Sequence, residues 1–146
     1  MNELQHAAKI AFASQFTFYL KAHFFHWNVE GIHFQELHSL FETIYSEVYG
    51  SIDEFAEKIR SLGAYAPGSS SRFSMLTQIA DETEVVEAGH MITELLADAD
   101  KMALILKIVY DQAEAAGEHG FSNFLAERMD AHKKHAWFLK SSIKGE

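Results

Sequence analysis

The sequence predicts an all-α protein built as a bundle of four long helices. Two observations carry this prediction: apolar residues recur at steps of three and four along four long segments, and no segment alternates as a strand would. The single Pro and the 8 Gly leave long stretches free of helix breakers. A chain of 146 residues can bury one core, so we expect a single domain over 1–146.

The first helix is expected over Asn2–Val29 and the second over Phe34–Leu62. Their apolar stripes are Leu4, Ala8, Ala11, Phe18, Ala22 and Phe25 in the first, and Phe41, Ile44, Val48, Ile52, Phe55, Ile59 and Leu62 in the second. Gly31 and Gly63 follow the two segments, as glycines often follow helix ends.

Residues 63–81 are predicted to form a long connection, because they hold the only Pro, two Gly and four Ser. A short helical turn is compatible with the sequence around Phe73–Ala80. When extended, this stretch can span roughly 60 Å, whereas a helix as long as the first one measures roughly 42 Å. The connection can therefore run the whole length of the bundle, as in ferritin-like four-helix bundles with one long crossover.

The third helix is expected over Asp81–Ala116, with acidic residues in its first turn, where the helix dipole favours them. Gly117 and Gly120 bracket a short turn. The last helix is expected over Phe121–Ser142.

One strip of the second helix carries polar and aromatic residues beside the apolar stripe. Its members are His38, Glu42, Tyr45, Tyr49, Asp53 and Ala56, with Glu57 at the edge. Asp53 and Glu57 are four residues apart, so both carboxylates can point at one ion, and His23 and His26 are three apart on the first helix. Imidazole and carboxylate ligands suit iron, zinc or manganese, and a chain with 0 Cys has no thiolate ligands.

His38 and Asp53 cannot reach the same ion within one chain, because the helix between them is roughly 22 Å long. If the two acids share a site with His26 and His38, they come from a second copy that runs antiparallel across a two-fold axis. Such a dimer has two equivalent sites. On spacing alone a second interpretation stays open, in which the histidines only pack and Asp53 and Glu57 belong to a solvated face.

The run from His26 to Ile59 resembles the signature of the Dps family of mini-ferritins. The pattern H-W-x-x-x-G-x-x-F-x-x-x-H, followed by D-x-x-A-E-[RK]-I, matches at His26, Trp27, Gly31, Phe34, His38, Asp53, Ala56, Glu57 and Ile59. The likeness extends over nearly the whole chain, through L-G-A-Y-A-P-G after the second helix to R-M-D-A-H-K-K-H-A-W-F-L near the end.

This resemblance implies a hollow shell of twelve subunits that oxidises Fe(II), preferring hydrogen peroxide to O₂, and stores the ferric product inside. It implies that His26 and His38 are the metal-binding and catalytic residues of one subunit. Asp53 and Glu57 would be supplied to the same site by its two-fold mate.

Four further residues are expected to support the site or the entry of iron. His23 and Glu42 match positions next to the ligands, Glu42 standing where Asp is common, and the oxidisable Trp27 adjoins them. Glu118 is expected to line an acidic threefold pore that admits iron.

The net charge of −9 predicts weak or no DNA binding, because an acidic surface repels phosphates. Dps proteins that coat DNA carry a lysine-rich tail, whereas here the first helix is expected to begin almost at Met1. The start of the sequence shows no signal-peptide pattern, and no run of about 18 apolar residues could span a membrane. We therefore expect a cytoplasmic protein.

Two other functions are compatible with parts of the sequence. A di-iron site inside one bundle would use Glu-x-x-His pairs, which occur at Glu3/His6, Glu30/His33 and Glu87/His90. The second pair straddles Gly31, and the other two begin helices that a long crossover puts at opposite ends of the bundle. The other rival is a DNA-binding or structural cage with little ferroxidase activity, against which the full set of ligands argues.

Overall fold

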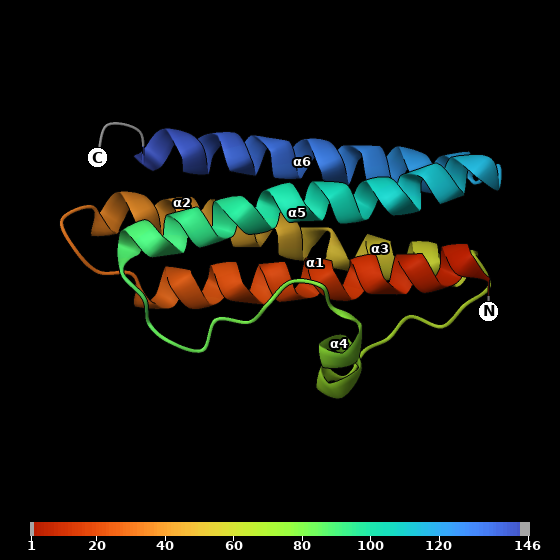
Figure 1. Ribbon diagram of the computed structural model, residues 1–146, viewed down its shortest axis with the longest axis horizontal. Helices are drawn as coiled ribbons and strands as arrows, with labels where there is room; N and C mark the ends of the chain where they lie inside the picture. The colour runs from red at the N-terminus through yellow and green to blue at the C-terminus, as the bar shows by residue number, and fades with distance from the viewer. Residues whose placement is uncertain (1, 144–146) are drawn as a thin grey trace.

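The computed structural model describes residues 2–143, which form six helices (Figure 1). In chain order they are α1 Glu3–Asn28, α2 Phe34–Gly50, α3 Ile52–Ser61, α4 Ser70–Leu76, α5 Ala88–Ala115 and α6 His119–Ile143. Helices α1, α5 and α6 and the α2–α3 pair lie side by side along one long axis (Figure 1). The described residues contain no strand. The prediction of an all-α four-helix bundle is confirmed.

The start of α1 is fixed by a reciprocal cap. The Asn2 side chain accepts a hydrogen bond from the Gln5 N–H at 2.8 Å, and the Gln5 side chain accepts one from the Asn2 N–H at 3.3 Å. The Gln5 amide nitrogen also donates to the carbonyl of Leu62 at 2.7 Å. This bond joins the start of α1 to the end of α3, so the two helices run antiparallel.

The second predicted helix is interrupted at Ser51, which divides it into α2 and α3. The Ser51 hydroxyl donates to the carbonyl of Val48 at 2.6 Å, and the Ser51 N–H bonds the same carbonyl at 3.1 Å. Such back-bonding by serine tightens and bends helices. The prediction of one unbroken helix over Phe34–Leu62 is therefore wrong at this residue.

The crossover is longer than predicted, because α5 begins at Ala88 rather than at Asp81. The Glu82 carboxylate accepts a hydrogen bond from the Glu84 N–H at 3.1 Å, a local turn that competes with helix. The acidic residues expected in the first turn of the third helix thus lie in the crossover. The short helix is α4, centred a few residues before the predicted position, and Ser69 caps it by accepting from the Arg72 N–H at 3.3 Å.

The crossover runs back along α1, as its length predicted (Figure 1). Phe73 of α4 stacks on Phe16 with ring centroids 4.6 Å apart, and the Gln78 N–H donates to the Ser14 hydroxyl at 2.9 Å. These contacts fasten the connection to the middle of α1.

A network of polar side chains crosses the core of the bundle. Arg128 of α6 donates two hydrogen bonds to Glu47 of α2, and the His135 Nε2 donates a third at 2.8 Å. These partners overcome the effect of burial and hold the pKa of Glu47 well below its usual value. Arg128 can only donate hydrogen bonds, so the side-chain oxygen of Gln15 faces it. The side-chain nitrogen of Gln15 then lies 2.7 Å from Nε2 of His132. Helices α1, α2 and α6 are thereby joined at mid-length.

Candidate metal centre

His26 and His38 hold each other in place across the turn between α1 and α2. Nδ1 of His26 donates to the carbonyl of His38 at 2.7 Å, and Nδ1 of His38 donates to the carbonyl of His26 at 2.8 Å. Their rings stack with centroids 3.8 Å apart. A carbonyl only accepts, so both Nδ1 atoms carry a proton, and in the neutral imidazole the free lone pair is then on Nε2. This is the tautomer in which Nε2 binds metals.

Glu42 completes a group of three potential ligands with these histidines. Its Oε1 lies 4.0 Å from Nε2 of His26, and one ligand atom from each of His26, His38 and Glu42 lies within 4.8 Å of the others. His26 is buried, whereas Glu42 is exposed. The resemblance assigned Glu42 a place beside the ligands, and the geometry groups it with them.

Asp53 and Glu57 lie outside this group. Both are exposed, and both are on α3, beyond the break at Ser51. One turn of helix separates them, so their carboxylates lie on one face. Within one chain, therefore, the histidines and these two acids lie apart, as two separate halves of the expected site.

Aromatic side chains surround the histidine half. His23 stacks flat on Tyr45 at 3.7 Å and packs on Trp27 at 4.0 Å, while its Nδ1 lies 2.9 Å from the hydroxyl of Tyr19. Burial, and then the neighbouring His26, lowers the pKa of His23. His23 is thus committed to neighbours and does not join the three-ligand group.

Tyr19 also belongs to the aromatic side chains around the histidines, and it was not identified from the sequence. Burial, followed by Tyr49 and Tyr45, raises its pKa, so the hydroxyl keeps its proton. The only signal was its position four residues before His23, on the same face of α1. Trp27 and Tyr49 are 59% and 58% exposed, a large aromatic area left open beside the histidines.

The predicted pore residue Glu118 lies in the turn between α5 and α6, where it is exposed. Its N–H donates to the carbonyl of Ala113 at 2.8 Å, and its own carbonyl accepts from Ser122 at 3.0 Å. These bonds fix the backbone of the turn and leave the carboxylate free.

The geometry does not support a di-iron site inside the bundle. Glu3 begins α1 and Glu87 precedes α5, and these helices begin at opposite ends of the molecule (Figure 1). Glu47, at the exposed end of the polar network, already accepts from the buried Arg128 and His135. A guanidinium at that position occupies the carboxylate that a metal would need.

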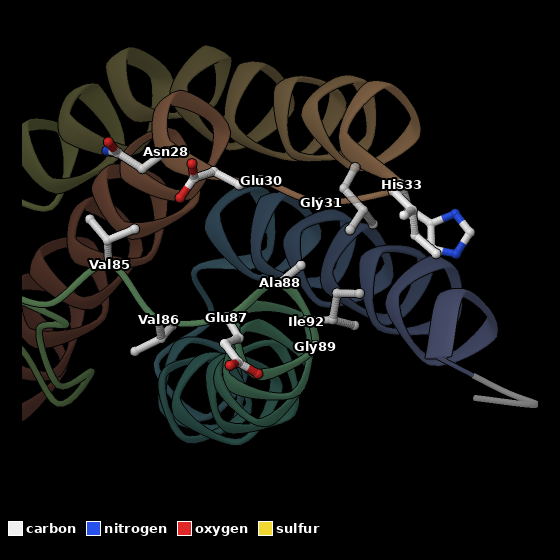
Figure 2. A pocket seen from close by; sticks show the side chains of 12 residues that line it. Asn28, Glu30, Gly31, His33, Val85, Val86, Glu87, Ala88, Gly89 and Ile92 are labelled. Carbon is white, nitrogen blue, oxygen red and sulfur yellow. The ribbon is translucent and has the colours of Figure 1, made fainter.

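A cavity of about 730 Å³ opens between the α1–α2 turn and the start of α5 (Figure 2). Its polar side chains include Glu30, His33 and Glu87, which lie well apart around the rim (Figure 2). They do not converge on one point, so the cavity is not a metal site of the kind formed by the histidines.

Among residues 2–143 we find no helix with the length and hydropathy needed to cross a membrane.

The family of the ferritin-like domain matches residues 5–145. The chain is 30% identical over 131 residues to the DNA protection during starvation protein of Brevibacillus brevis, covering 90% of this chain and 88% of that one. It is 31% identical over 136 residues to an uncharacterized low temperature-induced protein of Nostoc sp., covering 92% and 76% respectively.

Solved Dps structures share the whole fold. Dps from Thermosynechococcus elongatus superposes with a TM-score of 0.95 at 26% identity, covering 99% of this chain and 92% of that one. A Dps protein from Bacillus brevis superposes with a TM-score of 0.91 at 28% identity, covering 99% of both chains. With the sequence motif, the bundle with its crossover and these likenesses in agreement, the chain belongs to the Dps family of ferritin-like proteins.

Proposed function

We propose that this chain is a cytoplasmic ferroxidase that oxidises Fe(II) at a site shared by two copies and stores the ferric iron inside a dodecameric shell. His26 and His38 of one copy and the partner copy's Asp53 and Glu57 bind the metal. One observation carries the proposal: the two histidines fix each other with both Nε2 lone pairs free, beside Glu42.

The separation of the two halves supports a shared site. Asp53 and Glu57 lie beyond the Ser51 break, outside the group formed by the histidines. An antiparallel partner related by a two-fold axis brings its α3 to the histidines of the first copy and receives α3 in return. The exposed Trp27 and Tyr49 then become contact residues, as aromatic side chains often are in interfaces.

The donor set fits Fe(II). Two imidazoles and two or three carboxylates are ligands that iron accepts, and the carboxylates offset the charge of the cations as they are oxidised. Two Fe(II) ions each give one electron to one hydrogen peroxide, whose O–O bond breaks. The two oxygens take up two protons from solution, so the products are two Fe(III) and two molecules of water.

The acidic chain favours iron entry over nucleic-acid binding. A net charge of −9 in each copy attracts Fe(II) and repels DNA. Glu118, free in an exposed turn, is our candidate for a pore residue that iron passes.

A DNA-binding cage with little ferroxidase activity is the second candidate, because one relative is called a DNA protection during starvation protein. That name describes the relative. The acidic charge of this chain favours the ferroxidase.

Peroxide-dependent oxidation of added Fe(II) tests the proposal. We expect the wild-type chain to consume about one peroxide for every two Fe(II), and the double variant His38→Ala, Asp53→Ala to lose this activity. His33→Ala is the matched control, since His33 is an exposed histidine outside the group. Unchanged oxidation by the double variant would overturn the assignment.

A further inference from the structure

A second group of metal-binding side chains lies where the crossover joins α5. One ligand atom from each of Glu82, His90 and Glu94 lies within 4.8 Å of the others. Glu82 belongs to the crossover, while His90 and Glu94 are one turn apart on α5. None of these residues belongs to the site shared between copies.

The oxygens of Glu94 have different surroundings. Oε1 accepts an ion pair from the buried ammonium of Lys21 at 2.9 Å. Oε2 is shielded from solvent and has no hydrogen-bond partner, and it lies 3.3 Å from Nε2 of His90. A buried carboxylate oxygen without a partner is costly, because nothing replaces the water that it has lost.

The local charge leaves room for a cation. The ammonium of Lys21 bonds Glu94 at 2.9 Å and Asp98 at 2.7 Å, and Glu82 adds a further carboxylate beside Glu94. The N–H of Glu84 donates to the Glu82 carboxylate at 3.1 Å and holds it beside the start of α5. Carboxylate oxygens of Glu82 and Glu94 lie within 4.8 Å of each other, a spacing at which a bound cation would offset the repulsion between two negative charges.

We propose that Glu82, His90 and Glu94 bind one divalent first-row metal ion and thereby fasten the end of the crossover to α5. An imidazole with two carboxylates is a donor set that Zn²⁺ or Fe²⁺ accepts with positions left for water. Ligand atoms at about 2.1 Å from one ion lie at most about 4.2 Å from each other. Small rotations of Glu82 and His90 close the group from its present spacing, and both side chains reach solvent.

Zinc content measures this site separately from the shared one. The background is His38→Ala, Asp53→Ala, in which the shared site is disabled. Adding His90→Ala to it should remove one Zn²⁺ per subunit after equilibrium dialysis. Adding His33→Ala instead should remove none. His33 is a matched control because it is as exposed as His90, at 57% against 59%, and pairs with Glu36 at 3.4 Å. Equal zinc content in the two variants overturns the proposal, whatever the shared site does.

Hydrogen exchange tests the fastening of the crossover. In otherwise wild-type protein, Zn²⁺ should slow exchange of the amides of residues 82–87 by about tenfold or more, because opening this segment then requires release of the metal. Glu82→Gln, which removes only the crossover's own ligand, should abolish this slowing and leave the fold intact. Zinc-independent exchange in the wild-type chain, or slowing that survives in Glu82→Gln, would refute the role of the crossover.

Discussion

Nδ1 of His26 donates to the backbone carbonyl of His38, and Nδ1 of His38 donates to that of His26, at 2.7 and 2.8 Å. The pair is thus a single unit in which each ring orients the other. Removing one histidine removes a proposed ligand and also one of the bonds that hold its neighbour's backbone and ring in place.

We therefore expect His38→Ala to lower the initial rate of Fe(II) oxidation by about 10- to 100-fold or more, the range found when ligands or their supporting bonds are lost. Stopped-flow absorbance of the ferric product measures the rate. A rate within twofold of that of His33→Ala would show that the pair does not bind iron.

Glu42 should have a smaller effect than His38. It lies 4.0 Å from Nε2 of His26 but is exposed and can be replaced by water. We expect Glu42→Gln to weaken binding of Fe(II) under anaerobic conditions by about tenfold, as measured by titration calorimetry. Unaltered affinity for Fe(II) would show that Glu42 does not take part in binding the metal.

The core network predicts a pH-dependent stability. The pKa of Glu47 is lowered on folding, so its contribution is fully present above its usual value of 4.5 and is lost as pH falls below it. At pH 7 we expect Glu47→Gln to lower the free energy of unfolding by about 1–3 kcal/mol, a range that allows for the partial exposure of Glu47. Denaturant unfolding at pH 7 and at pH 3 should show the difference shrinking at the lower pH.

Glu36→Gln is the control for this measurement. Glu36 is exposed and pairs only with His33, so its substitution should change stability by less than about 0.5 kcal/mol at either pH. If Glu47→Gln lowers the free energy of unfolding by the same amount at both pH values, the result would contradict the lowered pKa of Glu47.

Binding to DNA should be weak and dependent on divalent cations, because each copy has a net charge of −9. Gel-shift titrations with and without Mg²⁺ measure this. Tight binding at moderate salt without Mg²⁺ would refute the prediction.

The helical pattern of the sequence was enough to predict the bundle and the separation of His38 from Asp53, because both follow from the regular rise of a helix. The break at Ser51 could not be predicted in this way. Ser51 lies 3.1 Å from the Gln15 amide, a contact between distant parts of the chain that no local pattern reports.

The group at the end of the crossover was missed for a related reason. Sequence reasoning put Glu82 and His90 on one continuous helix, where eight residues correspond to roughly 12 Å. The Glu84 N–H bonds Glu82 instead, the chain stays non-helical to Glu87, and Glu82 comes within reach of His90.

Complementation between variants tests whether two copies complete each site. Chains with His38→Ala and chains with Asp53→Ala are co-expressed with different tags and purified as mixed assemblies. In a mixed dimer one site lacks both residues, but the other has intact histidines from one copy and intact acids from its partner. Random pairing should restore about a quarter of the wild-type sites.

The matched control mixes His26→Ala with His38→Ala. Both substitutions then affect the histidine half, so no pairing yields a complete site. Our account predicts Fe(II) oxidation at about a quarter of the wild-type level in the first mixture and none above background in the second. Failure of the first mixture to exceed its inactive parent variants would contradict a site shared between copies.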